Sequence, residues 1–356
     1  MDDPAMTAPT PGAPEEVRPA SASQAPHSSA SGSVAVDSQA RESSGTARVL
    51  LRLLLTRLAS VAFVLFGAAT LAFAGLKLLP GDPVSTLLGP QTTASPAVRE
   101  QIREEYSFDR PVLAQYFGYL DDLVHLRFGE SYQLQRPVAD LIADQFAPTA
   151  QLAFSALLLS MVVAVVVAVL TAGRRGIGRS AANTLELVAV STPSFWLGIV
   201  LLTVFSFRMR VLPVAGADGF ESLVLPTITL AVPITAVLTQ VLRESMESAL
   251  DEPFALTARA RGLSRLGVQV RHILRHAALP LATLSGWLTG TLLGGTVLVE
   301  TVFARPGIGA LTLDAVTSRD MPVVMGVVLM AALCFAVISQ LVDALYLVID
   351  PRLRKG

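Results

Sequence analysis

Long apolar stretches alternate with short charged ones along this chain. Six stretches of roughly twenty residues contain no Asp, Glu, Lys or Arg. About 20 apolar helical residues cross the roughly 30 Å hydrocarbon core of a bilayer. The pattern therefore predicts an all-α polytopic membrane protein with six transmembrane helices. The six windows are 58–76, 145–173, 187–207, 222–242, 277–299 and 321–342.

Composition agrees with a membrane protein and disfavours an ion-coupled carrier. The chain is 52% hydrophobic and 15% charged, whereas soluble domains carry about 25% charged residues. A charge at the bilayer centre costs roughly 2.5–3.5 kcal/mol on insertion scales and persists mainly where a proton or ion path needs it. The six windows contain no charged residue, which argues against a proton-coupled carrier or an ion pump. A secondary carrier is also expected to show inverted repeats, and the sequence shows none by inspection.

Groups that could perform chemistry are sparse. No Gly-Lys pair is present to complete a phosphate-binding loop. No His or carboxylate lies inside a window to activate Ser155, Ser160, Ser194 or Ser285 as a nucleophile. The four His lack zinc-ligand spacing, and Cys334 is interpreted as a packing residue. We therefore expect no enzymatic activity, no metal and no cofactor.

The windows divide the chain into three parts. Residues 1–47 are rich in Ala, Pro, Ser, Gly and Thr and are predicted to be disordered. That tail is interpreted either as dispensable or as a regulatory, partner-binding segment. Residues 48–144 would hold the first transmembrane helix and an outer-face helical segment. Residues 145–356 would form a five-helix core that includes the loop 243–276.

Prolines mark helix starts and bends. Pro96, Pro111 and Pro137 each precede helical spacing of apolar residues, which predicts two or three short amphipathic helices on the outer membrane face. Other prolines lie inside the windows, where they either bend a helix locally or shape a gated path. These are Pro193, Pro226, Pro233 and Pro280.

The distribution of basic residues predicts the orientation. Lys and Arg are about twice as dense in the loops that lie inside if the N-terminus is cytoplasmic, as the positive-inside rule expects. Tight clusters at Arg174, Arg175 and Arg179 and at the C-terminal end agree. Both termini are therefore predicted to be cytoplasmic.

The loop 243–276 carries the most specific local signals. Pro253 after two acids predicts a helix start, and Gly262 can end that short helix. Phe254, Thr257, Ala258 and Arg261 are expected on one face, and Ser264 can cap a second helix. Such a helix fits a groove in another protein, but a basic loop on anionic lipid is equally compatible with the composition.

A second local signal is a stripe of glycines in the fifth window. Gly286, Gly290 and Gly294 recur every four residues, a spacing that lets two transmembrane helices approach closely. We expect these three residues to pack helices and to have no role in choosing a substrate.

Eight sequence motifs are spread along residues 48–356. They are TARARGLS at 257–264, RHILRHAALP at 271–280, LKLLPGDP at 76–83, DRPVLAQYFGYL at 109–120, STPSFWLGI at 191–199, VETVFARPGIGALTLDA at 299–315, RDMPVV at 319–324 and VDALYLVIDPRLR at 342–354. As a set they resemble the permeases of ATP-binding-cassette importers for dipeptides and oligopeptides, with nickel permeases as close relatives. The resemblance is strongest to the first, B-type, dipeptide permease subunit. Leu256 departs from the general importer pattern, which has an acid there.

The resemblance implies a bacterial inner-membrane subunit that imports peptides and does not hydrolyse ATP itself. Implied partners are a second homologous permease subunit, one or two ATPase subunits that bind ATP and Mg²⁺, an extracytoplasmic peptide-binding protein and the lipid membrane, but no nucleic acid. A nickel permease remains the alternative within the family, while a membrane scaffold would not need the motif set. The coupling helix that docks on the ATPase would use Phe254, Thr257, Ala258, Arg259, Arg261 and Gly262.

Overall fold

The computed structural model describes residues 33–78, 83–88, 95–105 and 109–349. It divides into two units, residues 1–56 and 57–356. The helix α1, Ser33–Leu78, begins inside the tail that the sequence predicts to be disordered, so that prediction is wrong for residues 33–47. The last proline of the tail is Pro26 and the next in the chain is Pro80, so no proline interrupts α1. The rest of the tail lies outside the described residues.

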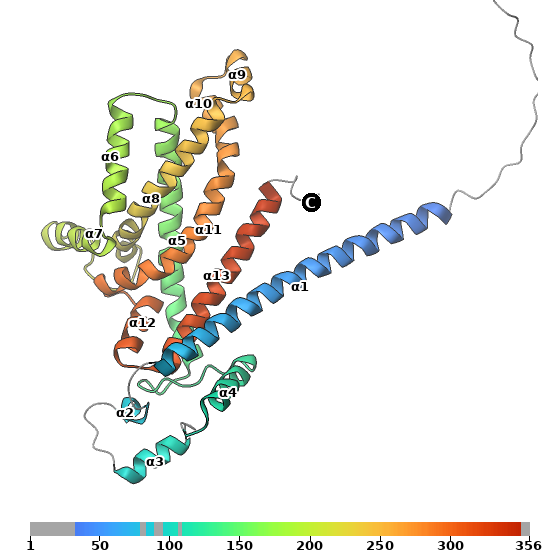
Figure 1. The fold of residues 1–356 in the computed structure, drawn as a ribbon. Helices are drawn as coiled ribbons and strands as arrows, with labels where there is room; N and C mark the ends of the chain where they lie inside the picture. Colours follow the sequence, from blue (N-terminus) through green and yellow to red (C-terminus); the bar gives the residue numbers. More distant parts are fainter. Residues whose placement is uncertain (1–32, 79–82, 89–94, 106–108, 350–356) are drawn as a thin grey trace, which may run out of the picture. The chain divides into compact units, whose positions relative to one another are not determined.

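The second unit is a bundle of long helices joined by short ones (Figure 1). The long helices after α1 are α5 (Val138–Thr171), α6 (Ile177–Ser191), α8 (Glu221–Leu250), α11 (Leu274–Val302) and α13 (Met321–Ile349). The short ones are α2 (Pro83–Leu88), α3 (Pro96–Glu105), α4 (Val112–Val124), α7 (Ser194–Leu201), η1 (Leu202–Arg208), α9 (Pro253–Ala260), α10 (Arg265–Val268), η2 (Gln269–Ile273) and α12 (Ile308–Thr317).

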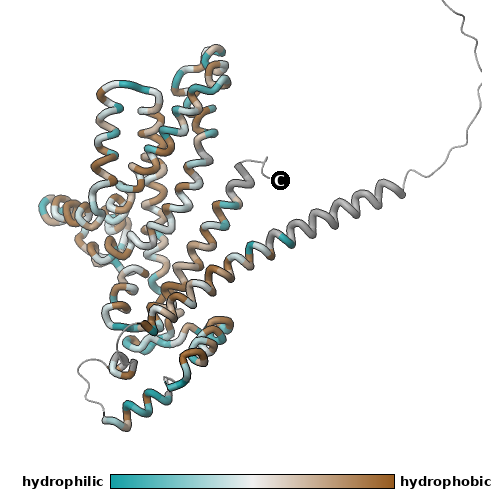
Figure 2. Tube along the Cα trace, viewed as in Figure 1, coloured by the Kyte–Doolittle hydropathy of each residue, from teal (hydrophilic) through white to brown (hydrophobic). Residues whose placement is uncertain are grey.

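Four helical segments in the described residues are long and apolar enough to cross a membrane, and a bent pair adds a fifth. The hydropathy along them is visible in Figure 2. The window 277–299 lies in α11, a continuous helix of 29 residues that is about 44 Å long. The chain is thus an all-α polytopic membrane protein. The four segments are Leu55–Leu78, Val138–Thr171, Glu221–Leu250 and Met321–Ala344.

The window 187–207 does not form one straight span. It is split between α6 and the helical segment Ser194–Arg208, and the chain bends by 103° between these two segments. Thr192 is extended, with φ −85° and ψ 122°, because the Pro193 ring disfavours a helical conformation in the residue before it. In contrast, α8 stays helical across Pro226 and Pro233.

The prolines of the predicted outer segment do stand at helix starts. Pro96 is the first residue of α3, and Pro111 and Pro137 cap α4 and α5. The chain boundary expected at 144/145 falls inside α5, which starts at Val138. Aromatic contacts attach α4 to α1, since the Phe73 and Tyr119 rings stack with centroids 5.9 Å apart.

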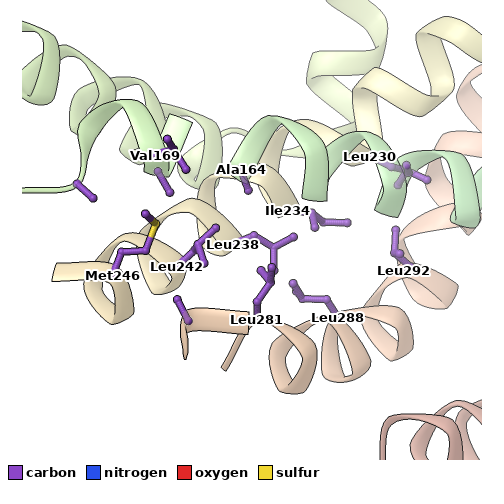
Figure 3. Packing of buried hydrophobic residues seen from close by; sticks show 14 of the residues in the cluster. Ala164, Val169, Leu230, Ile234, Leu238, Leu242, Met246, Leu281, Leu288 and Leu292 are labelled. Atoms are coloured by element: carbon purple, nitrogen blue, oxygen red, sulfur yellow. The ribbon is translucent and has the colours of Figure 1, made fainter. Parts of the chain in front are cut away.

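The core lies where α8 passes between α5 and α11 (Figure 3). Leu238, Leu242 and Met246 of α8 are completely buried in it. In water, burying a Leu or Met side chain stabilises a fold by about 1.5–3 kcal/mol. In a membrane the surrounding lipid is itself apolar, so this hydrophobic contribution is smaller and van der Waals packing between the helices contributes more. The Ser160 hydroxyl also donates to the Ala231 carbonyl at 3.1 Å. These contacts tie α5 to α8 along their length.

Candidate functional site between α8 and α11

The short helix α9 stands at one end of the long helices, beside α10 (Figure 1). Glu252 is its extended N-cap and Pro253 its first residue, where the missing proline N–H costs nothing. Gly262 follows the helix with φ +81°, a conformation that glycine adopts without steric cost. The helix starts and stops at the residues that the sequence indicates.

The faces of α9 differ from the prediction. Ala255 and Ala258 are buried against the rest of the chain, and the Phe254 ring lies on the His276 ring, with centroids 4.6 Å apart. Thr257 and Arg261 are exposed, so the four residues that the spacing places on one face of the helix are not all exposed together. Small alanines three residues apart let α9 sit close to the bundle, which decides which side remains free.

The exposed side of α9 is apolar at its centre and basic around it. Leu256 is 60% exposed, and Thr257, Arg259 and Arg261 are exposed beside it. The sequence interpretation noted Leu256 only as a departure from a motif, yet it is the largest free apolar side chain of the helix. A single exposed leucine is common on protein surfaces, so Leu256 marks the free side of α9 but does not by itself show an interaction site.

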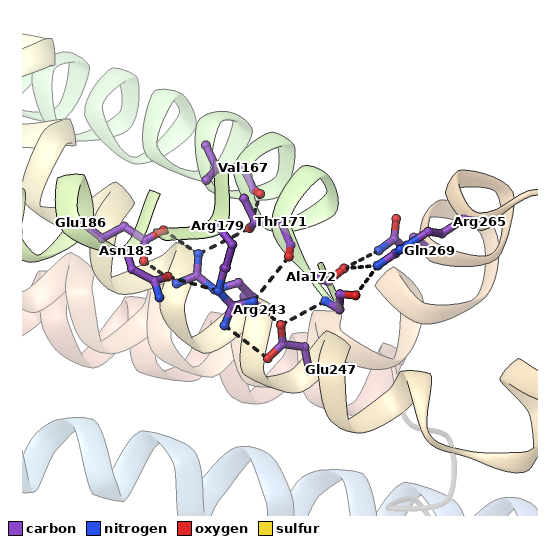
Figure 4. Close-up of polar contacts among 11 residues, drawn as sticks. Val167, Thr171, Ala172, Arg179, Asn183, Glu186, Arg243, Glu247, Arg265 and Gln269 are labelled. Atoms are coloured by element: carbon purple, nitrogen blue, oxygen red, sulfur yellow. Dashed lines mark hydrogen bonds and ion pairs between the residues drawn. The ribbon is translucent and has the colours of Figure 1, made fainter. Parts of the chain in front are cut away.

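The end of α5 lies next to this segment and is held by it (Figure 4). The Arg265 Nη2 atom donates to the Ala172 carbonyl at 3.1 Å and to the Gly173 carbonyl at 2.5 Å. The fully buried Gln269 donates from Nε2 to the same Ala172 carbonyl at 3.1 Å. These carbonyls lack helical partners and lie at the negative end of the α5 dipole, so a cation stabilises them.

Gly173 has a conformational and a steric reason to be glycine. Its φ is +61°, and a Cβ there would meet Leu250 Cδ1 at 2.9 Å and Arg265 Nη2 at 3.2 Å. Its own N–H donates to Glu247 Oε1 at 3.0 Å, and Glu247 also pairs with Arg179 of α6. The α5–α6 turn is thus anchored to α8 as well as to Arg265.

A buried ion pair joins α6 to α8, and the sequence analysis missed it. Arg243 donates to both Glu186 carboxylate oxygens, at 2.7 Å and 2.5 Å, and both side chains are buried. These residues lie just outside the charge-free windows at 187–207 and 222–242, which exclude charges by definition. Their bidentate pairing satisfies both charges. A structural role therefore accounts for these two buried charges, and a proton path is not required to explain them.

A second missed cluster lies at the end of the bundle opposite α9. The Glu300 carboxylate is fully buried and accepts from the Thr149 hydroxyl at 2.6 Å and from the Ala310 N–H at 3.1 Å. The Ile308 N–H donates to the same Thr149 hydroxyl at 2.8 Å. A Cβ on Gly307 would overlap the Glu300 carboxylate. The motif at 299–315 thus has a physical role, which is to close α12 onto α5 and α11.

Arg305 follows this cluster in the chain and is also buried, at 2% exposure. Its Nη2 atom donates to Gln151 Oε1 at 3.1 Å. Burial lowers the pKa of Arg305, and the nearby Glu300 carboxylate opposes that shift. The Glu300 and Arg305 charges therefore partly compensate each other inside this cluster.

Two of the three glycines in the α11 stripe pack closely against α13. A Cβ on Gly286 would meet Val342 Cγ2 of α13 at 2.5 Å, and one on Gly290 would meet the Phe335 ring at 3.0 Å. Gly294 has nothing within 4 Å of that position, so the expected packing is not seen there. Close contact between α11 and α13 at the stripe is therefore seen at Gly286 and Gly290.

Comparison with known proteins assigns the chain to a family. Residues 160–355 match the family described as "Binding-protein-dependent transport system inner membrane component", and residues 50–153 match its N-terminal companion family. The chain belongs to this family of transport proteins. It is therefore a membrane-spanning permease subunit of an ATP-binding-cassette importer.

Individual relatives are similar along most of this permease. The glutathione transport system permease protein GsiC of Escherichia coli strain K12 is 35% identical over 306 residues, which cover 86% of this chain and 99% of that protein. The protein of the same name from Shigella dysenteriae serotype 1 has the same identity and coverage. A crystal structure of an amino acid ABC transporter with histidines covers 58% of this chain and 93% of its own, with 16% identity and a TM-score of 0.45.

Proposed function

We propose that this permease imports dipeptides or short oligopeptides into a bacterial cell. The observation that carries the proposal is the similarity to GsiC over nearly the whole length of that protein, because GsiC is named as a transport protein for glutathione, which is a tripeptide. The peptide-type motif set at residues 257–280 supports the same substrate class. Nickel remains the comparison substrate in any test.

The permease would work as one part of a larger assembly. We propose a heterodimer with a second homologous permease, two ATPase domains that bind ATP and Mg²⁺, and an extracytoplasmic peptide-binding protein. The free side of α9, with Leu256 at its centre, would dock on the ATPase. In this arrangement the chain carries no catalytic residue and no cofactor, and both termini face the cytoplasm.

The test is transport by the reconstituted assembly. The complete complex is placed in proteoliposomes, and uptake of labelled glutathione, a labelled dipeptide and ⁶³Ni²⁺ is measured with ATP inside or outside the vesicle. ATP-dependent accumulation of a peptide is expected only when the ATPase and the binding protein are present. Uptake of nickel without peptide uptake, or uphill transport by the permease alone, would overturn the proposal.

A further inference from the structure

We propose that α5 is the strut that transmits movement of the α9 segment to the opposite end of the bundle, and that Arg265 and Thr149 are its two attachment points. This inference rests on the proposed function, because it assumes that an ATPase moves α9. It assigns positioning roles to two residues that the sequence analysis did not single out as functional.

The inner attachment is the C-terminal end of α5. Arg265 and Gln269 hold the carbonyls of Ala172 and Gly173 by three hydrogen bonds of 2.5–3.1 Å. Arg265 starts the helical run that follows α9, and Gly262 and Leu263 are bonded back to α9 carbonyls. A displacement of α9 therefore pulls directly on the last residues of α5.

The outer attachment is Thr149. Its hydroxyl donates to Glu300 Oε1 at 2.6 Å and accepts from the Ile308 N–H at 2.8 Å. One α5 side chain thus holds both the end of α11 and the start of α12. Thr149 and Glu300 are buried, at 4% and 0% exposure, so little water is available to replace these bonds.

The helix between the two attachments is suited to transmit movement. The 24 residues from Thr149 to Ala172 span about 35 Å at a rise of about 1.5 Å per residue, which is about the thickness of a bilayer core. No break interrupts α5, and it stays helical across Pro148. Its side chains are packed or hydrogen-bonded to α8 along this length, so the two helices would move together.

Two substitutions test the two attachment points of α5 separately. Arg265→Ala removes the hold on two carbonyls, and Thr149→Val removes the hydroxyl while keeping the shape of the side chain. The matched control is Arg271→Ala, which removes an exposed arginine from the same helical run. Each variant is studied in the complete reconstituted complex, with glutathione as the transported probe.

We measure glutathione molecules transported per ATP hydrolysed, together with the amount of ATPase that copurifies. Arg265→Ala is expected to lower this ratio about tenfold, the size expected for losing a charge-assisted hydrogen bond, with copurification unchanged. Arg271→Ala is expected to stay within about twofold, the effect of a surface substitution away from such features. The double variant of Arg265 and Thr149 should be no worse than the poorer single one, since both act in one connection.

Several outcomes would overturn the inference. Equal ratios for Arg265→Ala and Arg271→Ala, or additive effects in the double variant, would each do so. If Arg265→Ala does not assemble, Arg265→Lys decides, because it keeps the charge and reaches one carbonyl, and an intermediate ratio is expected. A wild-type complex that shows no ATP-driven glutathione uptake would instead count against the proposed function.

Discussion

At the scale of single residues, buried charged side chains hold helices of this permease together, although the apolar windows contain no charge. Glu186 and Arg243 satisfy each other through two hydrogen bonds in a buried position. Replacing one partner leaves an uncompensated buried charge, which costs more than the pair itself contributes. The pair therefore makes the packing of α6 on α8 depend on both residues being present.

Arg243→Ala is expected to destabilise the permease by about 3–5 kcal/mol, the cost of breaking a buried pair from one side. The double variant Glu186→Leu with Arg243→Met should recover most of that loss, because neither charge is then left unpaired. Thermal unfolding in detergent measures both, with the exposed Arg175→Ala as the control. A double variant less stable than Arg243→Ala would contradict this account.

Gly262 permits a second prediction about a single residue. Its Cβ position is open but its φ is +81°, so any L-residue pays only backbone strain of about 1–2 kcal/mol. Gly262→Ala should therefore keep most of the transport. Gly262→Glu adds a bulky charge beside the free side of α9 and should lower uptake per ATP while the complex still assembles. Equal uptake per ATP in the two variants would show that strain alone matters there.

At the scale of secondary-structure elements, small residues decide which helices can approach. Gly286 lies against Val342 of α13, and Gly290 lies against the Phe335 ring. The same property explains α9, where Ala255 and Ala258 form the buried side. In both helices the free side is whatever the small residues leave exposed.

Gly286→Ala is expected to lower thermal stability, because the new methyl group would overlap Val342 and overpacking costs about 1–3 kcal/mol. Gly294→Ala is the matched control in the same helix, since nothing lies within 4 Å of its Cβ position. Replacing a helical glycine in open space with alanine should be neutral or slightly stabilising. Equal melting temperatures for the two variants would mean that α11 and α13 do not pack as described.

At the scale of the whole molecule, the bundle has two polar clusters at opposite ends with a packed apolar core between them. One cluster gathers around the C-terminal end of α5, and the other around Glu300. The core of α5, α8 and α11 lies between them. This arrangement places α9 and α12 at opposite ends of the same helices (Figure 1).

Labelling in intact cells tests the orientation. A single cysteine replaces either Leu256 of α9 or Leu113 of α4, both exposed, in a background in which Cys334 is alanine. If the termini are cytoplasmic, a membrane-impermeant maleimide should label position 113 and should reach position 256 only after the cells are opened. Labelling of position 256 in intact cells would reverse the assigned topology.

The apolar windows were sufficient to predict an all-α membrane protein, because the length and composition of a helix that crosses a bilayer are local properties. The starts of α3, α5 and α9 were also predictable, since prolines and glycines act on the backbone next to them. The motif set identified the family because it depends on residue identity at fixed spacing. Each of these signals is complete within a short stretch of chain.

Other features depend on contacts between residues far apart in the sequence. Thr149 and Glu300 are 151 residues apart and share a hydrogen bond, and Arg265 holds carbonyls 92 and 93 residues earlier. Neighbouring helices likewise decide which side of α9 is buried. They also decide that Gly286 and Gly290 touch α13 while Gly294 does not. Hydropathy along the chain carries no information on such pairs, because only packing of the helices brings their atoms within bonding distance.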